Sequence, residues 1–261
     1  VISWLSNSKL TYEDSNNYYR SSFDYIVKKQ INHLINQIEG TNHYSDKLLG
    51  CCAIVLVGLS YKDERYLNFG LSLLHKIIKL SFSEDNFPKT RSVRQSLFYL
   101  KHFILIREFL KEAHNEIPEY LDEIIYYLGQ NYKMFFKDNE NFLFNGNINS
   151  NNKGFDEFLV SKGYKFNNIK NDVGGYVILR NKNFSIAMDV GPTPDKKFSN
   201  FYQSGTLSFE LYFKRKKLIT NSGYFQDRKH QLHLISKSTA AHSTAIIDNS
   251  SICGFKKRFD G

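Results

Sequence analysis

The chain has 261 residues, of which 41% are hydrophobic, enough for a substantial core and for one or two domains. A net charge of +9 favours an anionic partner: an acidic polysaccharide, a nucleic acid or a membrane surface. An odd number of cysteines, three, without CxxC spacing argues against a disulfide framework and a zinc knuckle. No apolar run reaches the ~20 residues of a membrane span.

The sequence pattern predicts helices in the first half of the chain. Apolar residues recur at helical spacing in five segments, which are 16–39, 45–60, 63–81, 92–113 and 118–136. Segment 45–60 is apolar nearly all round, which predicts a buried helix, with Ser45 as its candidate N-cap. The connections are short, so we expect consecutive helices to be antiparallel neighbours.

The pattern changes after Phe136, where a polar stretch rich in Asn and Gly begins. Beyond it, short strand-like runs alternate with turn residues, at 176–180, 184–190, 207–213, 217–220, 244–248 and 251–255. Helices followed by strands predict segregated layers or domains and not βαβ alternation. We expect helices only before about residue 137 and mainly strands after about residue 160.

Two polar motifs precede predicted helices. Asn42 and His43 stand before the buried helix, where the helix dipole favours an anion; the alternative is that they only cap it. Arg91 and Arg94 open the helix at 92–113 and could clamp a carboxylate in bidentate fashion. The alternative is a solvated helix start, although cations there oppose the helix dipole.

The strand-rich half holds three further motifs. They are Phe201–Leu211, Asn221-Ser222-Gly223-Tyr224 and Ser238–Thr244. Each alone reads as a loop with a strand, and a single histidine such as His242 is more often a hydrogen-bonded structural residue than a ligand.

Together, these motifs resemble the heparinase II/III-like polysaccharide lyases. The resemblance rests on Leu-Ser-Phe-Glu-Leu at 207–211, Ser-Gly-Tyr at 222–224 and Ala-His-Ser-Thr at 241–244, in that order. Gly-Tyr-Val at 175–177, Asp-x-Gly at 189–191, Asn-His at 42–43 and Arg-Ser at 91–92 also fit. The chain is most similar to a less characterised bacterial branch and would be a fragment of a longer protein.

The resemblance implies an α+β multidomain architecture. Residues 1–137 would form a partial α/α toroid, residues 138–160 a linker, and residues 161–261 the N-terminal part of an antiparallel β-sandwich domain. It also implies β-elimination on a uronate-containing acidic polysaccharide, such as a glycosaminoglycan or alginate, in the bacterial cell envelope or periplasm. Neither nucleic acid nor a membrane span is expected.

The resemblance also implies roles for individual residues. The uronate carboxylate must be neutralised, and a general acid–base group must move protons. The catalytic candidates are Asn42, His43 and His242; the substrate-binding candidates are Arg91, Arg94, Tyr202 and Gln203. If the family packing holds, these residues converge on one basic groove.

The chain departs from the family at the positions that hold zinc in some members. Those positions fall at Gln203, Gly205 and Asn221, and only His242 matches. Four ligands of His, Cys or carboxylate type are typical of zinc, so we expect neither zinc nor another cofactor.

A second departure affects catalysis. The catalytic tyrosine of alginate-lyase relatives falls at Gln95, with Tyr99 one helical turn later. The alternative to a lyase is therefore a non-catalytic relative that binds acidic glycans. A basic nucleic-acid binder has only the charge in its favour.

Overall fold

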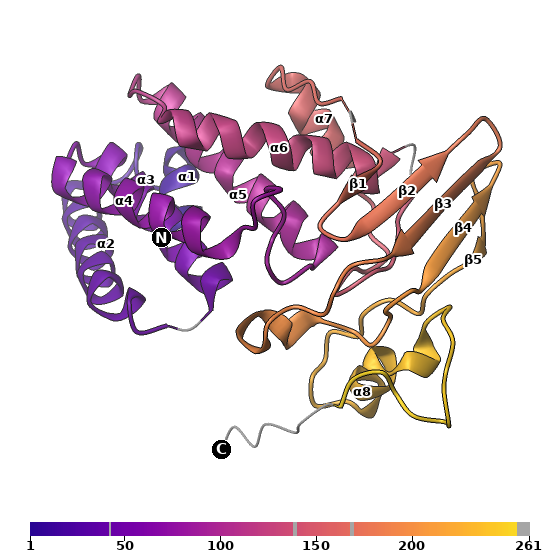
Figure 1. The fold of residues 1–261 in the computed structure, drawn as a ribbon. Helices are drawn as coiled ribbons and strands as arrows, with labels where there is room; N and C mark the ends of the chain where they lie inside the picture. The colour runs from indigo at the N-terminus through magenta and orange to yellow at the C-terminus, as the bar shows by residue number, and fades with distance from the viewer. Residues whose placement is uncertain (42, 138–139, 168–169, 255–261) are drawn as a thin grey trace. The chain divides into compact units, whose positions relative to one another are not determined.

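The computed structural model describes residues 1–41, 43–137, 140–167 and 170–254 (Figure 1). The chain divides into two compact units. The first comprises Val1–Ser81 and Tyr99–Ile125, and the second comprises Phe82–Phe98 and Tyr126–Gly261. Asn42, a predicted site residue, lies outside the described residues.

The helices of the first half confirm the periodicity of the sequence. They are α1 (Ile2–Ser6), η1 (Ser8–Leu10), α2 (Asn17–Ile38), α3 (Tyr44–Ser60) and α4 (Glu64–Ser81), followed by α5 (Val93–Glu112) and α6 (Glu119–Phe135). The division between the units falls within α5 and α6. The start of α2 is capped by Asn16, whose side chain accepts a hydrogen bond from the Tyr19 amide at 2.9 Å.

Helix α3 is the buried helix that the sequence predicts, although it begins one residue before Ser45. Ten of its residues are buried, and each fully buried Leu, Ile or Val contributes roughly 1.5–3 kcal/mol. Glycines let α3 and α4 approach closely, since a Cβ at Gly58 would lie 2.6 Å from the Leu67 amide nitrogen. The two helices therefore pack backbone against backbone at this point.

The second unit contains a five-stranded antiparallel meander (Figure 1). Its strands are β1 (Asp172–Val173), β2 (Tyr176–Arg180), β3 (Phe184–Asp189), β4 (Phe209–Phe213) and β5 (Lys216–Ile219), in the order β1-β2-β3-β4-β5. Short helical elements flank the sheet: α7 (Lys153–Ser161), η3 (Lys196–Phe201), α8 (Gln231–Lys237) and η4 (Thr239–Ala241). A helical region and an antiparallel sheet are thus confirmed, while the toroid, the sandwich and the predicted boundaries remain predictions.

Two expectations about the second half were wrong. Helices α7 and α8 lie beyond residue 137, because short apolar faces are enough for helices of nine and seven residues. Segments 244–248 and 251–254 form no strand among the described residues; an isolated bridge joins Ile247 to Ser250. The Thr244 hydroxyl instead donates to the Thr206 carbonyl oxygen at 2.8 Å, which holds this segment as a loop.

One face of the sheet buries charged groups. Along β3 and β4 burial alternates, so that Asp189 and Glu210 point inward together with Tyr212. Both carboxylates are fully buried and each has a cationic partner, which is Arg91 for Asp189 and Lys217 for Glu210. A buried carboxylate without a partner would be strongly destabilising.

Candidate functional site

Arg91 is a buried residue of the second unit. Its Nη2 contacts Asp189 Oδ1 at 2.5 Å, and its Nε donates to the Gly174 carbonyl oxygen at 2.8 Å. Nη1 donates to the Pro192 carbonyl oxygen at 2.7 Å, and the guanidinium lies 4.8 Å from the ring centroid of Tyr176. These contacts turn the guanidinium toward the interior of the second unit, and its assignment to substrate binding stays a prediction.

Two glycines make room for this guanidinium. A Cβ at Gly175 would lie 2.7 Å from Arg91 Nη2, and one at Gly191 would lie 2.6 Å from it. Gly175 also has a φ of +78°, which residues with a Cβ rarely adopt. The Gly-Tyr-Val and Asp-x-Gly motifs of the sequence therefore form the cradle of Arg91.

Asn145 links Asp189, the partner of Arg91, to Gln203. Asn145 Nδ2 donates to Asp189 Oδ2 at 3.0 Å, and Asn145 Oδ1 accepts from the backbone amide nitrogen of Gln203 at 3.1 Å. We call Arg91, Asp189, Asn145 and Gln203 the buried polar chain. Burial raises the pKa of the Asp189 carboxyl, whereas Arg91 and Asn145 lower it.

Gln203 is the last residue of the buried polar chain, and its side chain forms hydrogen bonds to three separate segments. Its Oε1 accepts from the Gly146 amide at 3.0 Å, and its Nε2 donates to the carbonyl oxygens of Gly223, at 2.9 Å, and Ser236, at 2.6 Å. The side chain is fully buried, so its amide joins three loop and helix segments of the second unit. These partners use both amide protons of Gln203, and the prediction that it binds substrate remains untested.

The Arg-Ser motif also shapes the start of α5. The Gln95 amide nitrogen donates to Ser92 Oγ at 3.3 Å, the N-terminal half of a capping box. Gln95 Oε1 accepts from the Thr90 hydroxyl at 2.6 Å, and Gln95 is buried. The residue at the relatives' tyrosine position therefore stabilises the helix start.

The two ring nitrogens of His242 differ in their hydrogen bonding. Nδ1 lies 2.8 Å from the Ser238 carbonyl oxygen, which favours a proton on Nδ1 and a lone pair on Nε2. Nε2 is buried and has no hydrogen-bond partner among the described residues, as is also true of Ser204 Oγ and Ser208 Oγ. Burial lowers the pKa of His242, so the imidazole is neutral at pH 7.

Tyr202 lies beside Gln203 and is also buried. Its hydroxyl is 2.8 Å from Thr206 Oγ1, and burial raises its pKa. Its assignment to substrate binding stays a prediction.

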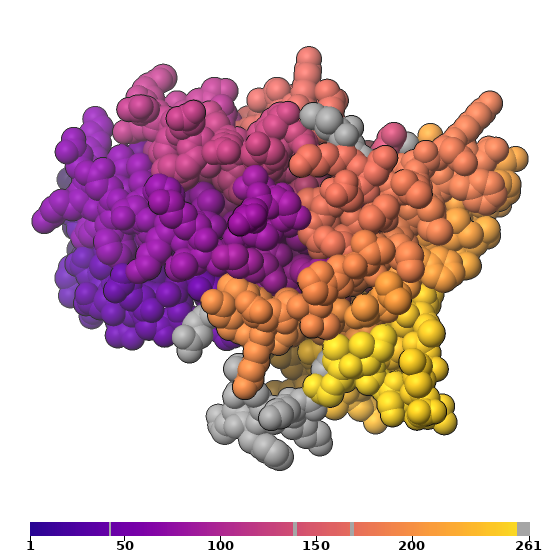
Figure 2. All heavy atoms as spheres, viewed as in Figure 1, coloured from indigo at the N-terminus to yellow at the C-terminus, as the bar shows by residue number. Residues whose placement is uncertain are grey.

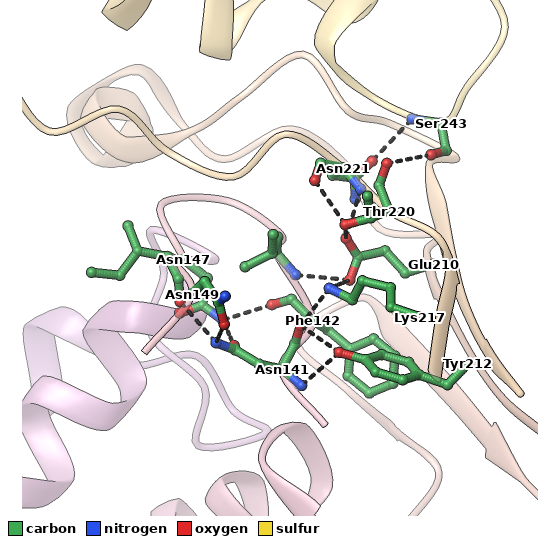
Figure 3. Close-up of polar contacts among 12 residues, drawn as sticks. Asn141, Phe142, Asn147, Asn149, Glu210, Tyr212, Lys217, Thr220, Asn221 and Ser243 are labelled. Atoms are coloured by element: carbon green, nitrogen blue, oxygen red, sulfur yellow. Dashed lines mark hydrogen bonds and ion pairs between the residues drawn. The ribbon is translucent and has the colours of Figure 1, made fainter. Parts of the chain in front are cut away.

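Asn221 belongs to the network around Glu210 (Figure 3). Its backbone amide donates to Glu210 Oε1 at 2.7 Å, and its Oδ1 accepts from the Ser243 amide at 3.0 Å. Glu210 Oε2 also accepts from Lys217 Nζ at 3.1 Å. The Asn221 side chain thus holds the 241–244 motif against the end of β5.

The donor set around His242 does not fit zinc. In the described ranges, no three His, Cys, Asp or Glu residues are grouped so that they could hold a metal ion. Gln203 uses its amide for protein contacts, Gly205 has no side chain, and Asn221 is uncharged.

A more accessible cationic group surrounds Tyr224. Arg94, which is half-buried, donates from Nη2 to Gln226 Oε1 at 3.1 Å. Burial raises the pKa of Tyr224, while the nearby Arg228 and Arg94 lower it. Lys237 has a lowered pKa because of burial and the nearby Arg228. We call Arg94, Arg228 and Lys237 the cationic rim.

The remaining candidates lie in the first unit. His43 is exposed at the N-cap of α3, and its side chain makes no capping hydrogen bond. Tyr99 is 2% exposed, and burial raises its pKa to about 12, so it is a poor base near neutral pH.

The structure thus connects Arg91 and Gln203 and places Tyr202 and His242 in the same unit. Sequence reasoning missed Asn145 and Arg228, and it left Asp189 without a role. The Asp-x-Gly motif was the available signal for Asp189; an asparagine in a polar loop gave none for Asn145.

The fold and these motifs define a protein with a helical region and an antiparallel sheet that carries lyase-like signatures. Residues 168–261 match the family model described as heparinase II/III-like, C-terminal. This match confirms the resemblance to the heparinase II/III-like family in the C-terminal region of the chain. No curated protein matches the chain.

Solved structures of similar fold carry related names. A crystal structure of heparinase III matches with a TM-score of 0.75 and 16% identity, over 92% of this chain and 45% of that one. Heparan sulfate lyase HepC from Pedobacter heparinus matches with a TM-score of 0.65 and 17% identity, over 86% of this chain and 40% of that one. The chain spans less than half the length of either structure. None of the described helices is long and apolar enough to cross a membrane.

Proposed function

We propose that this chain is part of a polysaccharide lyase-like protein that cleaves a uronate-containing acidic polysaccharide by β-elimination. The cationic rim around Tyr224 is the observation that carries the proposal. In such a reaction a base removes the proton beside the carboxyl group and the bond to the glycosidic oxygen breaks. The leaving oxygen takes up a proton to become a hydroxyl group, and the sugar that lost the proton becomes an unsaturated uronate. The proton is very weakly acidic until a cation neutralises the carboxylate, a role that suits Arg94 and Arg228.

Two histidines are candidates for proton transfer. His242 has the neutral imidazole and the free Nε2 lone pair that a base needs, but this nitrogen is buried. His43 is exposed, and with Asn42 it matches the family's Asn-His pair. We therefore assign proton transfer to His43, with Asn42 as its neighbour in the family's motif.

A second candidate function is non-catalytic binding of acidic glycans. It is supported by Gln95 and Gln203, whose amides cannot act as acid or base near neutral pH. Both amides are also engaged in contacts within the protein.

The test is an absorbance screen for unsaturated uronate over heparan sulfate, alginate and other acidic polysaccharides. We expect cleavage of at least one, and a loss of about 10²–10⁴-fold in His43→Ala and in Asn42→Ala. Circular dichroism checks that both variants keep their fold. If the wild type binds acidic glycans but cleaves none, the binding function is correct; an unaffected His43→Ala would refute the site assignment but not the class.

A further inference from the structure

A basic hollow lies at the turn ends of the β2–β3 and β4–β5 hairpins. Its volume is about 440 Å³, within the range of roughly 300–1,000 Å³ that small ligands occupy. The charged residues that line it are Lys137, Glu140, Arg180, Lys182, Lys214 and Arg215. The hollow is at the opposite end of β3 from Asp189, separated by about 16 Å of strand, so it is distinct from the buried polar chain. Orange segments of the sheet reach the surface on the face drawn in Figure 2.

Positive charge dominates this hollow. Five of its lining residues are cationic, and Glu140 is the carboxylate among them. Arg180 Nε already contacts Glu140 at 2.9 Å, and Glu140 is 7% exposed. An anionic ligand would therefore meet several cations that Glu140 does not neutralise.

The β4–β5 turn keeps two of these cations at a conformational cost. Phe213 pairs with Lys216, so Lys214 and Arg215 form a two-residue turn in which both φ values are positive, at 46° and 67°. Asn-Gly is strongly preferred in such a turn, because residues with a longer side chain are strained there. Folding alone would favour other residues at both positions.

The neighbouring β2–β3 turn is hydrogen-bonded to the β4–β5 turn. Asn181 Oδ1 accepts hydrogen bonds from the amides of Asn183 and Phe184, both at 2.8 Å. The Lys214 amide donates to the Asn183 carbonyl oxygen at 2.7 Å, which ties the two turns together. The backbones that carry Lys182, Lys214 and Arg215 are therefore pre-organised around the hollow.

We propose that this hollow is a second binding site, which takes a sulfated or carboxylated sugar segment of an acidic glycan. The chemistry favours a glycan over a single-stranded nucleic acid, because bases bind on exposed aromatic platforms. Tyr212 is the aromatic residue among the described lining residues, and it is 6% exposed with its hydroxyl bonded to Asn141. The identity of the glycan rests on the proposed function, whereas the anion site does not.

The test separates binding from folding. In Lys214→Asn/Arg215→Gly the two cations are replaced by the residues that the turn prefers, so thermal stability should rise while binding falls. Titration with a heparin-derived tetrasaccharide should show about a tenfold or greater loss of affinity. The control is Lys9→Asn/Lys62→Gly, which removes two exposed cations that do not line the hollow, one of them also at positive φ (51°).

The proposal holds if the turn variant loses affinity and the control retains it. An equal loss in both variants would show a diffuse charge effect and overturn it, as would the absence of any binding to the tetrasaccharide. Tighter binding of a thymidine oligonucleotide that also depends on the turn would overturn the glycan assignment. Because the readout is binding, a wild type that cleaves no polysaccharide would refute the proposed function and leave this inference standing.

Discussion

Arg91 and Arg94 stand three residues apart at the start of one helix, yet their surroundings differ. Arg91 is 6% exposed and contacts Asp189 and three backbone carbonyl oxygens. Arg94 is half-buried and contacts the exposed Gln226. One sequence motif therefore supplies both a buried arginine that is the cationic partner of Asp189 and a half-buried arginine nearer the surface.

The largest effect is expected from Arg91→Ala. It leaves Asp189 buried without its cation, which typically costs about 3–5 kcal/mol. Denaturant unfolding would measure the loss, with Arg94→Ala as the control that stays within about 0.5 kcal/mol. Similar losses in the two variants would break the comparison.

Gln203→Met should be nearly as destabilising. The methionine matches glutamine in size but leaves the Gly146 amide and the carbonyl oxygens of Gly223 and Ser236 without their partner. We expect a loss of about 2–4 kcal/mol in the free energy of unfolding. Gln226→Met, an exposed amide, is the matched control, and a stable Gln203→Met would mean that water replaces the amide.

Arg94→Ala tests the other side of the comparison. Removing a charge-assisted contact to a uronate carboxylate should lower kcat/KM, or the affinity for oligouronate, by about 10–100-fold at unchanged stability. Lys111→Ala removes an exposed cation elsewhere on α5 and should leave both quantities unchanged. No difference between the two variants would remove Arg94 from the site.

The smallest expected effect is on the pH dependence of stability. Burial lowers the pKa of His242 below 6.5, so in the acidic range the unfolded chain binds a proton more readily than the folded chain. The contribution of neutral His242 to the free energy of unfolding is complete above about pH 6.5. It falls as the pH drops toward the pKa of His242 in the folded state. Unfolding curves of His242→Asn should show a weaker pH dependence in that window than those of the wild type.

The sequence predicted the parts of this molecule that depend on local pattern. Helix α3 was recognisable because apolar residues surround it, and β2 and β3 because short β-rich runs flank a turn. Helix α8 was missed because its seven residues bury little more than His233 and Ser236. The contacts of Arg91 and Gln203 could not be predicted, since they join residues up to 101 positions apart.

Gln203 has one further consequence, for the dynamics of the second unit. Its side chain is bonded at once to Gly146, Gly223 and Ser236, so none of these segments can detach without breaking a bond to the same amide. Amide hydrogens in the three segments should therefore exchange with solvent as one cooperative opening unit, although the segments are far apart in the sequence.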